Sequence, residues 1–494
     1  MKKIRLIAVL SAVILILSSF TAFGETGSDE NNTVSGTVVT APQSVTEPGI
    51  YAEAAVLLEE GTGKILYSKN ADKKMYPAST TKIMTSMIFL EYFNKDDVIE
   101  VGTEVREVSL DSSKAGHVVG ESITAENLVR GLIIPSGNDS AVVAACAVAR
   151  KIENNNSLGL DECERIFSGL MNKKAEELGC TGTHFTNPHG YHDDDHYTTA
   201  SDMAKIASEG MKNELIKQIV SERSFQGNGM GSQSQNGLKT QDYDWKSHNL
   251  LITNSEYGYE YANGVKTGFT DEAGDSVVAS AEKDGVKLIA VIYNSEDPNR
   301  WLDAKNLFEY GFNNFGYFTL NKANDAVYSA ELVYNKADGG NTLDLVIKDD
   351  IVLFLPKTEV GTISTEIKVT NDELLYTKDD KSDDKTSVTL KAPIAKDTNI
   401  GTVSYKTADG TVLAETNVYS SRDVEKANIF MRAFYNVKSF VSNFISHISI
   451  LKVVIIIVVL VIIIILIRLL RGRRGGYHSK PKYKYSVNKR RRFK

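Results

Sequence analysis

The chain is organised around residues 77–85, which read Pro-Ala-Ser-Thr-Thr-Lys-Ile-Met-Thr. We expect a loop to turn into a helix here, with Ser79 and Lys82 on one face of the first helical turn, where their polar ends meet. The free N–H groups of that turn favour negative charge on the serine oxygen. A desolvated Lys82 can lose its proton and act as the base that activates the hydroxyl. The segment is therefore a candidate S-x-x-K nucleophile.

Two shorter motifs lie downstream. Residues 136–138 read Ser-Gly-Asn before an expected helix, where a serine and an amide carbonyl can relay a proton and orient a peptide, although Ser and Asn are also ordinary N-cap residues. Residues 266–268 read Lys-Thr-Gly at the entry of an expected strand, where a cation and a hydroxyl can clamp a carboxylate. Each motif is weak alone, as are further S-x-x-K tetrads elsewhere in the chain, among them those that begin at Ser382, Ser479 and Ser486.

Both ends of the chain indicate export and membrane attachment. Residues 1–24 join a basic start to an apolar run, as a secretory signal peptide does. A transmembrane helix is predicted over 446–470, because 453–467 is uninterrupted apolar sequence and Lys452 can extend to the interface. From Arg468 to the end lie 12 basic and no acidic residues, which predict a cytoplasmic tail over 471–494 on a single-pass protein of the cell membrane. A buried core helix and a nucleic-acid-binding arm are the alternatives for these two segments.

Composition argues against nucleic acid as a partner. Of the 56 basic residues, 3 lie in the signal and 12 after the apolar run, which leaves 41 basic against 63 acidic residues over 25–467, a net charge of −22. A surface of this sign repels phosphate backbones. Cys146, Cys163 and Cys180 show no metal-binding spacing; we expect mostly small buried residues, and one disulfide stays open.

The residue pattern predicts four extracytoplasmic regions. Residues 25–50 are polar and form a flexible leader. Residues 51–318 form an α/β layered domain, in which strands from both ends flank a helical insertion. Residues 319–420 alternate short apolar runs with turn residues and form a small all-β domain. Residues 424–445 form an amphipathic helix leading onto the membrane surface. Strands are expected over 54–59, 64–68 and within 264–293, the last with a turn at 284–285, and helices over 125–133, 141–151, 163–178, 201–209 and 301–315.

The order S-x-x-K, S-x-N, K-T-G closely resembles that of the serine D-alanyl-D-alanine carboxypeptidases, the low-molecular-mass penicillin-binding proteins. The resemblance covers about residues 50–420. It implies a penicillin-binding-protein/β-lactamase-like transpeptidase domain, followed by a β-rich stalk. The matching segments are Glu60–Lys64, Pro77–Thr85, Ser136–Asp139, Met171-Asn172, Leu178-Gly179, Phe185–Gly190, His196–Ala200, His248-Asn249, Gly264–Gly274 and Lys391–Ile394.

The resemblance implies a catalytic role for four side chains. Ser79 would form an acyl-enzyme with the penultimate D-alanine of a peptidoglycan stem peptide and release the terminal D-alanine. Lys82 would be the acylation base, while Ser136 and Asn138 would shuttle protons and orient the acyl chain. Water would then deacylate the ester, and no metal or other cofactor is required. β-Lactams would acylate Ser79 as mimics of the substrate amide.

The resemblance also implies a substrate-binding set around the K-T-G strand. Lys266 would supply positive charge and hydrogen bonding, and Thr267 and Arg300 would hold the peptide carboxylate. Gly268 completes the strand motif. The backbone N–H of Phe269 would form the oxyanion hole together with that of the nucleophile.

Departures from the family pattern are modest. Pro135 precedes the S-x-N triplet where another residue is usual, Tyr191 replaces a leucine, and Ser140 replaces an alanine. They leave every proposed catalytic side chain in place. The span and the basic tail are a larger departure, because many relatives end in an interfacial amphipathic helix.

Four other functions compete with this hypothesis. The histidines and aspartates at 189 and 192–196 could bind zinc, although no H-E-x-x-H motif is present. A β-lactam-acylated sensor without turnover would need an output domain, which the short tail does not resemble. A D,D-endopeptidase acting on cross-linked peptides stays open. A class A-type β-lactamase would need a deacylating glutamate after the S-x-N triplet, for which no convincing candidate is found.

Overall fold

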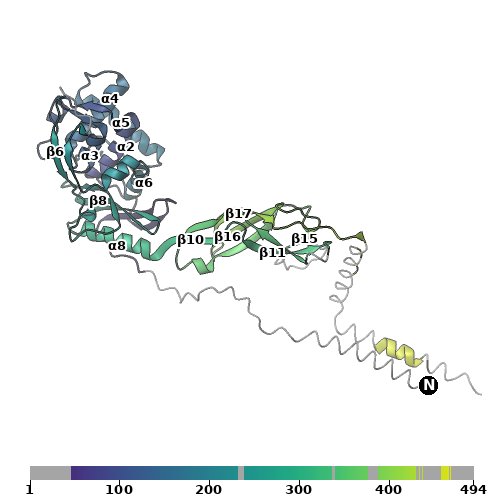
Figure 1. Cartoon of the computed structure of the whole chain (residues 1–494). Coiled ribbons are helices and arrows are strands. Elements are labelled where there is room, and N and C mark those ends of the chain that lie inside the picture. The colour runs from purple at the N-terminus through teal and green to yellow at the C-terminus, as the bar shows by residue number, and fades with distance from the viewer. Residues whose placement is uncertain are drawn as a thin grey trace, which may run out of the picture. The chain divides into compact units, whose positions relative to one another are not determined.

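The computed structural model describes residues 46–231, 238–336, 340–376 and 388–429, together with 433, 437, 458–466 and 468. The chain divides into two compact units. The first contains the chain up to Phe318 and also Phe354–Gly361, and the second contains Thr319–Leu353 and the chain from Thr362 onward. Figure 1 shows helices and strands in the first unit, and in the second unit strands followed by a short helix at residues 458–466.

The first unit is built on one five-stranded antiparallel sheet of order β2-β1-β9-β8-β7. Strands from both ends of the unit meet in it, as the sequence predicts. A two-residue turn at Asp284 and Gly285, both with positive φ (51° and 78°), joins β8 to β9, and Asp-Gly is typical of such a hairpin. The strands are β1 (Ala54–Glu59), β2 (Ile65–Lys69), β7 (Ala262–Gly268), β8 (Asp275–Lys283) and β9 (Val286–Ser295).

Helices cover both faces of this sheet, which explains why β1 reads as a continuous apolar run. Alternate side chains of β1 point to opposite faces. Ala54, Val56 and Leu58 pack in the core with α6 (Ala200–Met211), whereas Ala55 and Leu57 pack with α8 (Asn299–Asn314). The two faces therefore bury two separate hydrophobic clusters.

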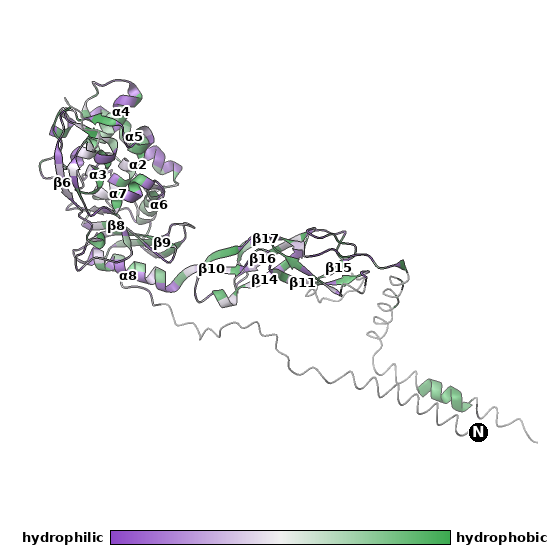
Figure 2. Ribbon diagram, in the orientation of Figure 1, coloured by the Kyte–Doolittle hydropathy of each residue, from purple (hydrophilic) through white to green (hydrophobic). Residues whose placement is uncertain are grey.

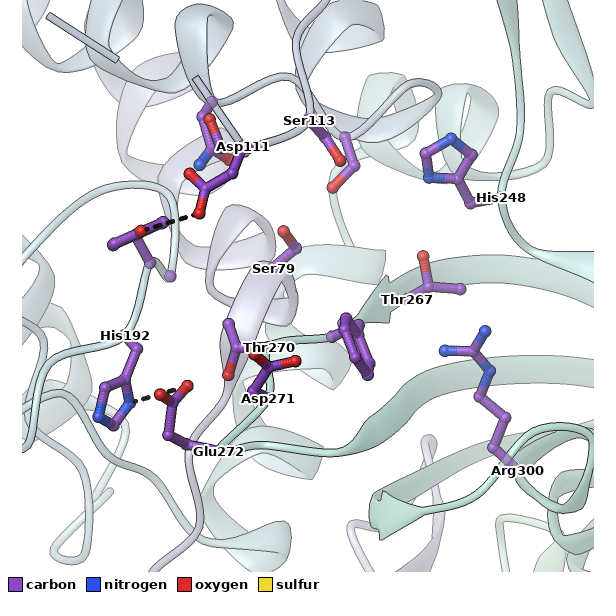
Figure 3. A pocket seen from close by; sticks show the side chains of 17 residues that line it. Ser79, Asp111, Ser113, His192, His248, Thr267, Thr270, Asp271, Glu272 and Arg300 are labelled. Atoms are coloured by element: carbon purple, nitrogen blue, oxygen red, sulfur yellow. Dashed lines mark hydrogen bonds and ion pairs between the residues drawn. The ribbon is translucent and has the colours of Figure 1, made fainter. Parts of the chain in front are cut away.

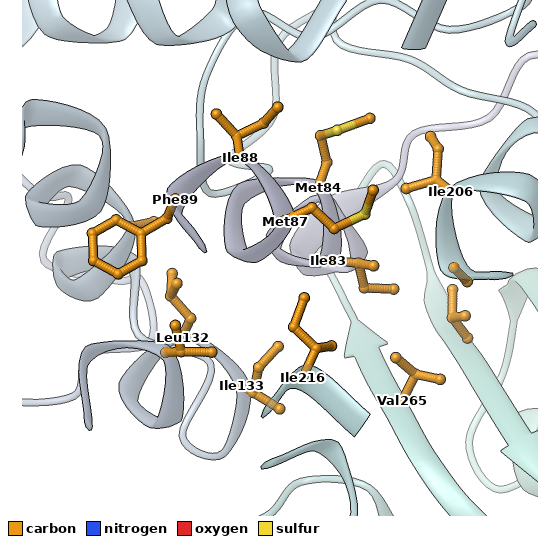
Figure 4. Close-up of a cluster of buried hydrophobic side chains, with 14 of the residues drawn as sticks. Ile83, Met84, Met87, Ile88, Phe89, Leu132, Ile133, Ile206, Ile216 and Val265 are labelled. Carbon is orange, nitrogen blue, oxygen red and sulfur yellow. The ribbon is translucent and has the colours of Figure 1, made fainter. Parts of the chain in front are cut away.

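Helix α2 (Lys82–Tyr92) runs through the middle of the helical part (Figure 4). Every residue of this helix from Lys82 to Phe89 is buried, on all of its sides. The reason is that α2 packs against α3, α4, α5 and α6 at once. The surrounding helices are α3 (Ala125–Ile133), α4 (Asn138–Glu153), α5 (Leu160–Glu177) and α7 (Glu214–Val220).

Smaller elements complete the first unit. Two short antiparallel sheets pair β3 (Val98–Glu100) with β4 (Ser122–Thr124) and β5 (Ser224–Asn228) with β6 (Asp242–Lys246). Cys146, Cys163 and Cys180 are all buried and free, as expected for small buried residues. Short 3₁₀ helices occur at Ala78–Thr81, Thr103–Arg106 and Leu250–Ile252.

The second unit is a β domain, as the sequence predicts. Six strands form a sheet of order β14-β16-β17-β12-β11-β15, whose core includes Ala330, Leu343, Val403 and Val418. The strands are β11 (Ala326–Val333), β12 (Thr342–Val346), β14 (Ser364–Val369), β15 (Thr389–Lys391), β16 (Asn399–Lys406) and β17 (Val412–Ser420). A separate two-stranded sheet pairs β10 (Phe315–Asn321) with β13 (Ile351–Pro356), and a 3₁₀ turn follows at Val360–Thr362.

Several sequence predictions fall on other parts of the chain. Residues 1–24, 471–494 and the tetrads at 382, 479 and 486 lie outside the described residues, as do most of 25–50 and 430–457. Residues 458–466 are helical and uniformly hydrophobic (Figure 2). No helix within the described residues is both long and apolar enough to cross a bilayer.

Candidate active site

Ser79 lies in a 3₁₀ turn (Ala78–Thr81) directly before α2, not in the first turn of the α-helix as predicted from sequence. Lys82, the first residue of α2, still reaches it, with Nζ 2.9 Å from Ser79 Oγ. The turn is held in a sparsely populated conformation, because Ala78 has a φ of 46°. Gly190 permits this, since a Cβ at that position would lie 1.8 Å from the Ala78 carbonyl oxygen.

The amine of Lys82 is completely buried and has three partners. Besides Ser79 Oγ, Nζ lies 2.7 Å from Asn138 Oδ1 and 2.8 Å from the main-chain oxygen of His189. The two carbonyl oxygens can only accept hydrogen bonds. A neutral amine therefore donates both of its hydrogens to them, and its lone pair then points at Ser79 Oγ. The geometry is that of a base positioned to take the serine proton.

The electrostatics of the site favour this neutral form. Burial and the nearby charge of Lys266 lower the pKa of Lys82 far below its ordinary value, while Asp139 acts in the opposite direction. Desolvation penalises the ammonium form and no carboxylate hydrogen-bonds Nζ.

Ser136 and Lys266 form a second serine–lysine pair. Lys266 Nζ lies 2.8 Å from Ser136 Oγ and 3.1 Å from the Thr267 carbonyl oxygen. Ser136 lies just before α4 and has a φ of 60°. Each of the two serines therefore lies at or directly after a residue with a strained, positive φ: Ser136 itself, and Ala78 directly before Ser79. Burial, and then the charge of Arg300, lower the pKa of Lys266 to about 7. Near neutral pH this group is poised between cation and amine.

The K-T-G strand lies against the nucleophile turn at the edge of the sheet. Gly268 ends β7, and a Cβ there would lie 3.0 Å from the Pro77 carbonyl oxygen and 3.2 Å from Ala78 Cβ. A glycine at this position therefore lets strand and turn pack closely. Thr267 lines the same pocket as Ser79, and the side chain of Phe269 is exposed at its rim.

All nine site residues predicted from the sequence come together around one pocket of about 530 Å³, which most of them line, with the two buried lysines just beneath. Figure 3 shows Ser79 between two flanks of opposite charge. One flank carries Arg300, His248 and Thr267, and the other carries Asp111, Asp271 and Glu272. An anionic group entering the pocket is attracted to the first flank and repelled by the second.

Arg300 is partly neutralised where it stands. Its Nη1 lies 2.9 Å from Asp275 Oδ1, and its Nε lies 2.8 Å from Asp297 Oδ1 without the alignment of a hydrogen bond. Its guanidinium also covers the ring of Trp301. Arg300 therefore contributes a shared, not a full, positive charge to the pocket.

The backbone amides of Ser79 and Phe269 are available as donors. Among the described residues, no turn, loop or cap hydrogen bond uses either N–H. Both residues line the pocket. Two free N–H groups beside a nucleophile are the elements of an oxyanion hole.

The histidine-rich loop has structural partners. His196 Nδ1 accepts from the Thr186 N–H and Nε2 lies 2.9 Å from Thr81 Oγ1, while burial lowers the pKa of His196 to about 3. His189 Nδ1 accepts from the Tyr191 N–H, and Nε2 faces Glu164 at 3.4 Å. Within the described residues no group of histidine, cysteine and carboxylate side chains could hold a metal ion.

Sequence reasoning missed two groups that act on Lys82. The main-chain carbonyl of His189 carries no residue-specific signature, although its loop belongs to the matching segments. Asp139 follows the S-x-N triplet directly, and its carboxylate accepts backbone N–H groups of residues 115–117. Its position beside Asn138 was the available signal.

Comparison with known proteins identifies relatives of both units. The family of D-alanyl-D-alanine carboxypeptidases matches residues 41–297, and the C-terminal domain of penicillin-binding protein 5 matches residues 315–426. D-alanyl-D-alanine carboxypeptidase DacF of Bacillus subtilis is 32% identical over 383 residues, which cover 76% of this chain and 86% of the relative.

Two further matches, both from Haemophilus influenzae, extend the comparison to a second bacterium and to a solved structure. D-alanyl-D-alanine carboxypeptidase DacA of Haemophilus influenzae is 30% identical over 397 residues, which cover 78% of this chain and 88% of the relative. The crystal structure of penicillin-binding protein 5 from Haemophilus influenzae is 29% identical with a TM-score of 0.52, and covers 77% of this chain and 100% of its own.

Proposed function

The chain belongs to the D-alanyl-D-alanine carboxypeptidase family, and we propose that it uses Ser79 to remove the terminal D-alanine from peptidoglycan stem peptides. The family is one of serine peptidases, and the nucleophile assignment is carried by one observation. Ser79 Oγ lies in an open pocket 2.9 Å from a buried amine whose other two contacts are carbonyl oxygens.

Acylation follows from this arrangement. Neutral Lys82 takes the proton of Ser79 as Oγ attacks the carbonyl carbon of the penultimate D-alanine. Positive charge then appears on Lys82 while negative charge appears on the substrate oxygen. The N–H groups of Ser79 and Phe269 stabilise that oxygen, by about 3 kcal/mol for each well-placed donor.

Breakdown of the tetrahedral intermediate needs a proton at the leaving nitrogen. The two serine–lysine pairs lie side by side, because Asn138 contacts Lys82 and Ser136 contacts Lys266 within one turn. The proton passes to the nitrogen through Ser136, the C–N bond breaks, and D-alanine leaves. Water then hydrolyses the Ser79 ester, with the same groups acting in reverse.

The cationic flank gives the pocket its preference for a free carboxyl terminus. Thr267 and Arg300 line the side of the pocket where the leaving D-alanine would stand, and Lys266 lies buried next to Thr267. A terminal carboxylate there would accept hydrogen bonds from the threonine hydroxyl and the guanidinium. β-Lactams carry a carboxylate next to a strained amide, and they acylate the same serine without a leaving group that diffuses away.

The direct test is D-alanine release from a D-Ala-D-Ala-terminated peptide by the detergent-solubilised full chain. Release is expected, and a matched peptide ending in D-Ala-L-Ala should be a poor substrate. A protein that is labelled by penicillin yet releases no D-alanine would contradict the proposal and favour a binding or sensor function.

We also propose that residues 1–24 direct export and that 446–470 anchor the protein, with 471–494 in the cytoplasm. The apolar run and the basic tail support this orientation. An epitope at the C-terminus should resist protease added to intact protoplasts, while the catalytic domain is cleaved. Cleavage of the epitope before lysis would overturn this topology.

A further inference from the structure

Ser140, one of the departures from the family pattern, has a specific partner. Its Oγ lies 2.8 Å from His117 Nε2, and both side chains are buried. Buried polar groups are costly unless hydrogen-bonded, so the pair depends on both members. Ser140 is in the first turn of α4, two residues after Asn138.

The other side of His117 is held by a buried carboxylate. His117 Nδ1 lies 2.8 Å from Glu121 Oε1 and 2.9 Å from Tyr243 Oη, and the Tyr243 hydroxyl donates to the same carboxylate. Burial would raise the pKa of Glu121, but the hydrogen bonds from His117 and Tyr243 outweigh it and lower that pKa. An ionised Glu121 fixes the hydrogen on Nδ1, which leaves Nε2 to face Ser140.

A second set of bonds joins the same two segments. The Asp139 carboxylate accepts the backbone N–H groups of Ala115, Gly116 and His117 at 2.7, 2.8 and 3.0 Å. The Asn138 N–H donates to the Ser113 carbonyl at 2.9 Å. Residues 113–117 are therefore held against the start of α4 by four hydrogen bonds.

Two catalytic contacts depend on where this start lies. Ser136 Oγ is 2.8 Å from Lys266 Nζ, and Asn138 Oδ1 is 2.7 Å from Lys82 Nζ. We propose that His117 is a positioning residue, which holds the Ser136–Asn138 turn in register through its bond to Ser140. It does not touch the substrate, and the inference rests on the proposed function.

Matched variants separate the two sides of His117. His117→Asn keeps an amide near Nδ1 and loses the bond to Ser140, whereas His117→Gln keeps a polar group near Nε2. Ser140→Ala removes the partner and leaves His117 Nε2 without this bond. In the full chain, His117→Asn and Ser140→Ala should each slow penicillin acylation and kcat for D-alanine release by about tenfold, which is less than the ~10²-fold that a misplacement of about 1 Å can cost.

The pattern of effects distinguishes positioning from general stability. KM should change by less than about twofold, the double variant should be no slower than the worse single variant, and His117→Gln should recover most of the rate. His184→Asn, at an exposed histidine, is the control and should behave as the unmodified protein. The proposal would be overturned if penicillin acylated Ser140→Ala at the rate of the unmodified protein. It would also be overturned if His117→Asn and His117→Gln lost equal amounts of activity.

Hydrogen exchange tests the positioning role of His117 even if the proposed enzymatic function is wrong, because it does not depend on activity. If the unmodified chain is not acylated by penicillin, the function is wrong, and hydrogen exchange decides the inference alone. Backbone exchange over residues 134–140 should be faster in Ser140→Ala and His117→Asn than in the unmodified chain. Unchanged exchange there would overturn the positioning role.

Discussion

Two buried lysines in this molecule each contact a serine at nearly the same distance, yet their surroundings differ. Lys82 Nζ is 2.9 Å from Ser79 Oγ, and Lys266 Nζ is 2.8 Å from Ser136 Oγ. Lys82 is enclosed by two further carbonyl oxygens, whereas Lys266 has one, at 3.1 Å, and the charge of Arg300 nearby.

This difference shows that a Ser–Lys contact alone does not define a nucleophile. Ser79 is half-buried at the pocket, whereas Ser136 is only 3% exposed. The carbonyl oxygens around Lys82 direct its lone pair to Ser79, and Lys266 has no such complete set. The first pair is suited to attack, and the second to proton relay and carboxylate binding.

The largest effect should come from removing the two serines in turn. Ser79→Ala should lower D-alanine release by about 10⁴-fold or more, because no acyl-enzyme can form. Ser136→Ala should lower it by only about 10²-fold, since it removes a proton relay. Equal losses of kcat/KM in the two variants would contradict the assignment of Ser79 as nucleophile and Ser136 as proton relay.

The next effect tests the base. Lys82→Met keeps the volume of the side chain but has no lone pair for the serine proton, so penicillin acylation should slow by about 10³-fold. Lys82→Arg is the matched control, because it keeps hydrogen-bond donors at this position but stays protonated and cannot take the serine proton. Stopped-flow labelling should show similar losses for both; a fast arginine variant would mean that charge, not basicity, matters.

A pH profile separates the two lysines. The neutral form of Lys82 is required, so activity is lost as pH falls through its lowered pKa. The cationic form of Lys266 is required, so kcat/KM should fall as pH rises through about 7. Lys266→Arg stays charged and should lose this alkaline limb, even if its overall rate is lower. Persistence of the limb in that variant would assign it to another group.

The smallest effect concerns the shared charge at Arg300. Arg300→Gln should raise KM about threefold to tenfold with little change in kcat, because a carboxylate contact is lost equally in ground and transition states. The alkaline limb should also move to higher pH, since Arg300 lowers the pKa of Lys266. Asp297→Asn is the reciprocal control and should not raise KM.

Much of this site could be predicted from the chain order of three motifs. The strand at 54–59 and the turn at 284–285 also follow from local pattern, because burial on both faces and Asp-Gly chemistry leave clear signals. The position of Ser79 ahead of the helix was not predicted, since the 3₁₀ turn depends on contacts with Gly190 and β7.

The contacts that distinguish the two lysines lie beyond sequence reasoning for a physical reason. A main-chain carbonyl such as that of His189 is present in every residue, and this one is 107 residues from Lys82. The His117–Ser140 bond likewise joins residues 23 apart through tertiary packing. Motifs identify the reactive side chains, while the fold decides which of them is activated.

The most direct test of the account is to map the residue that penicillin acylates. The full chain would be labelled, digested and sequenced by tandem mass spectrometry, with Ser136→Ala labelled in parallel. The account predicts the adduct on Ser79 in both proteins. An adduct on Ser136 in the unmodified chain, or one on any residue other than Ser79, would contradict it.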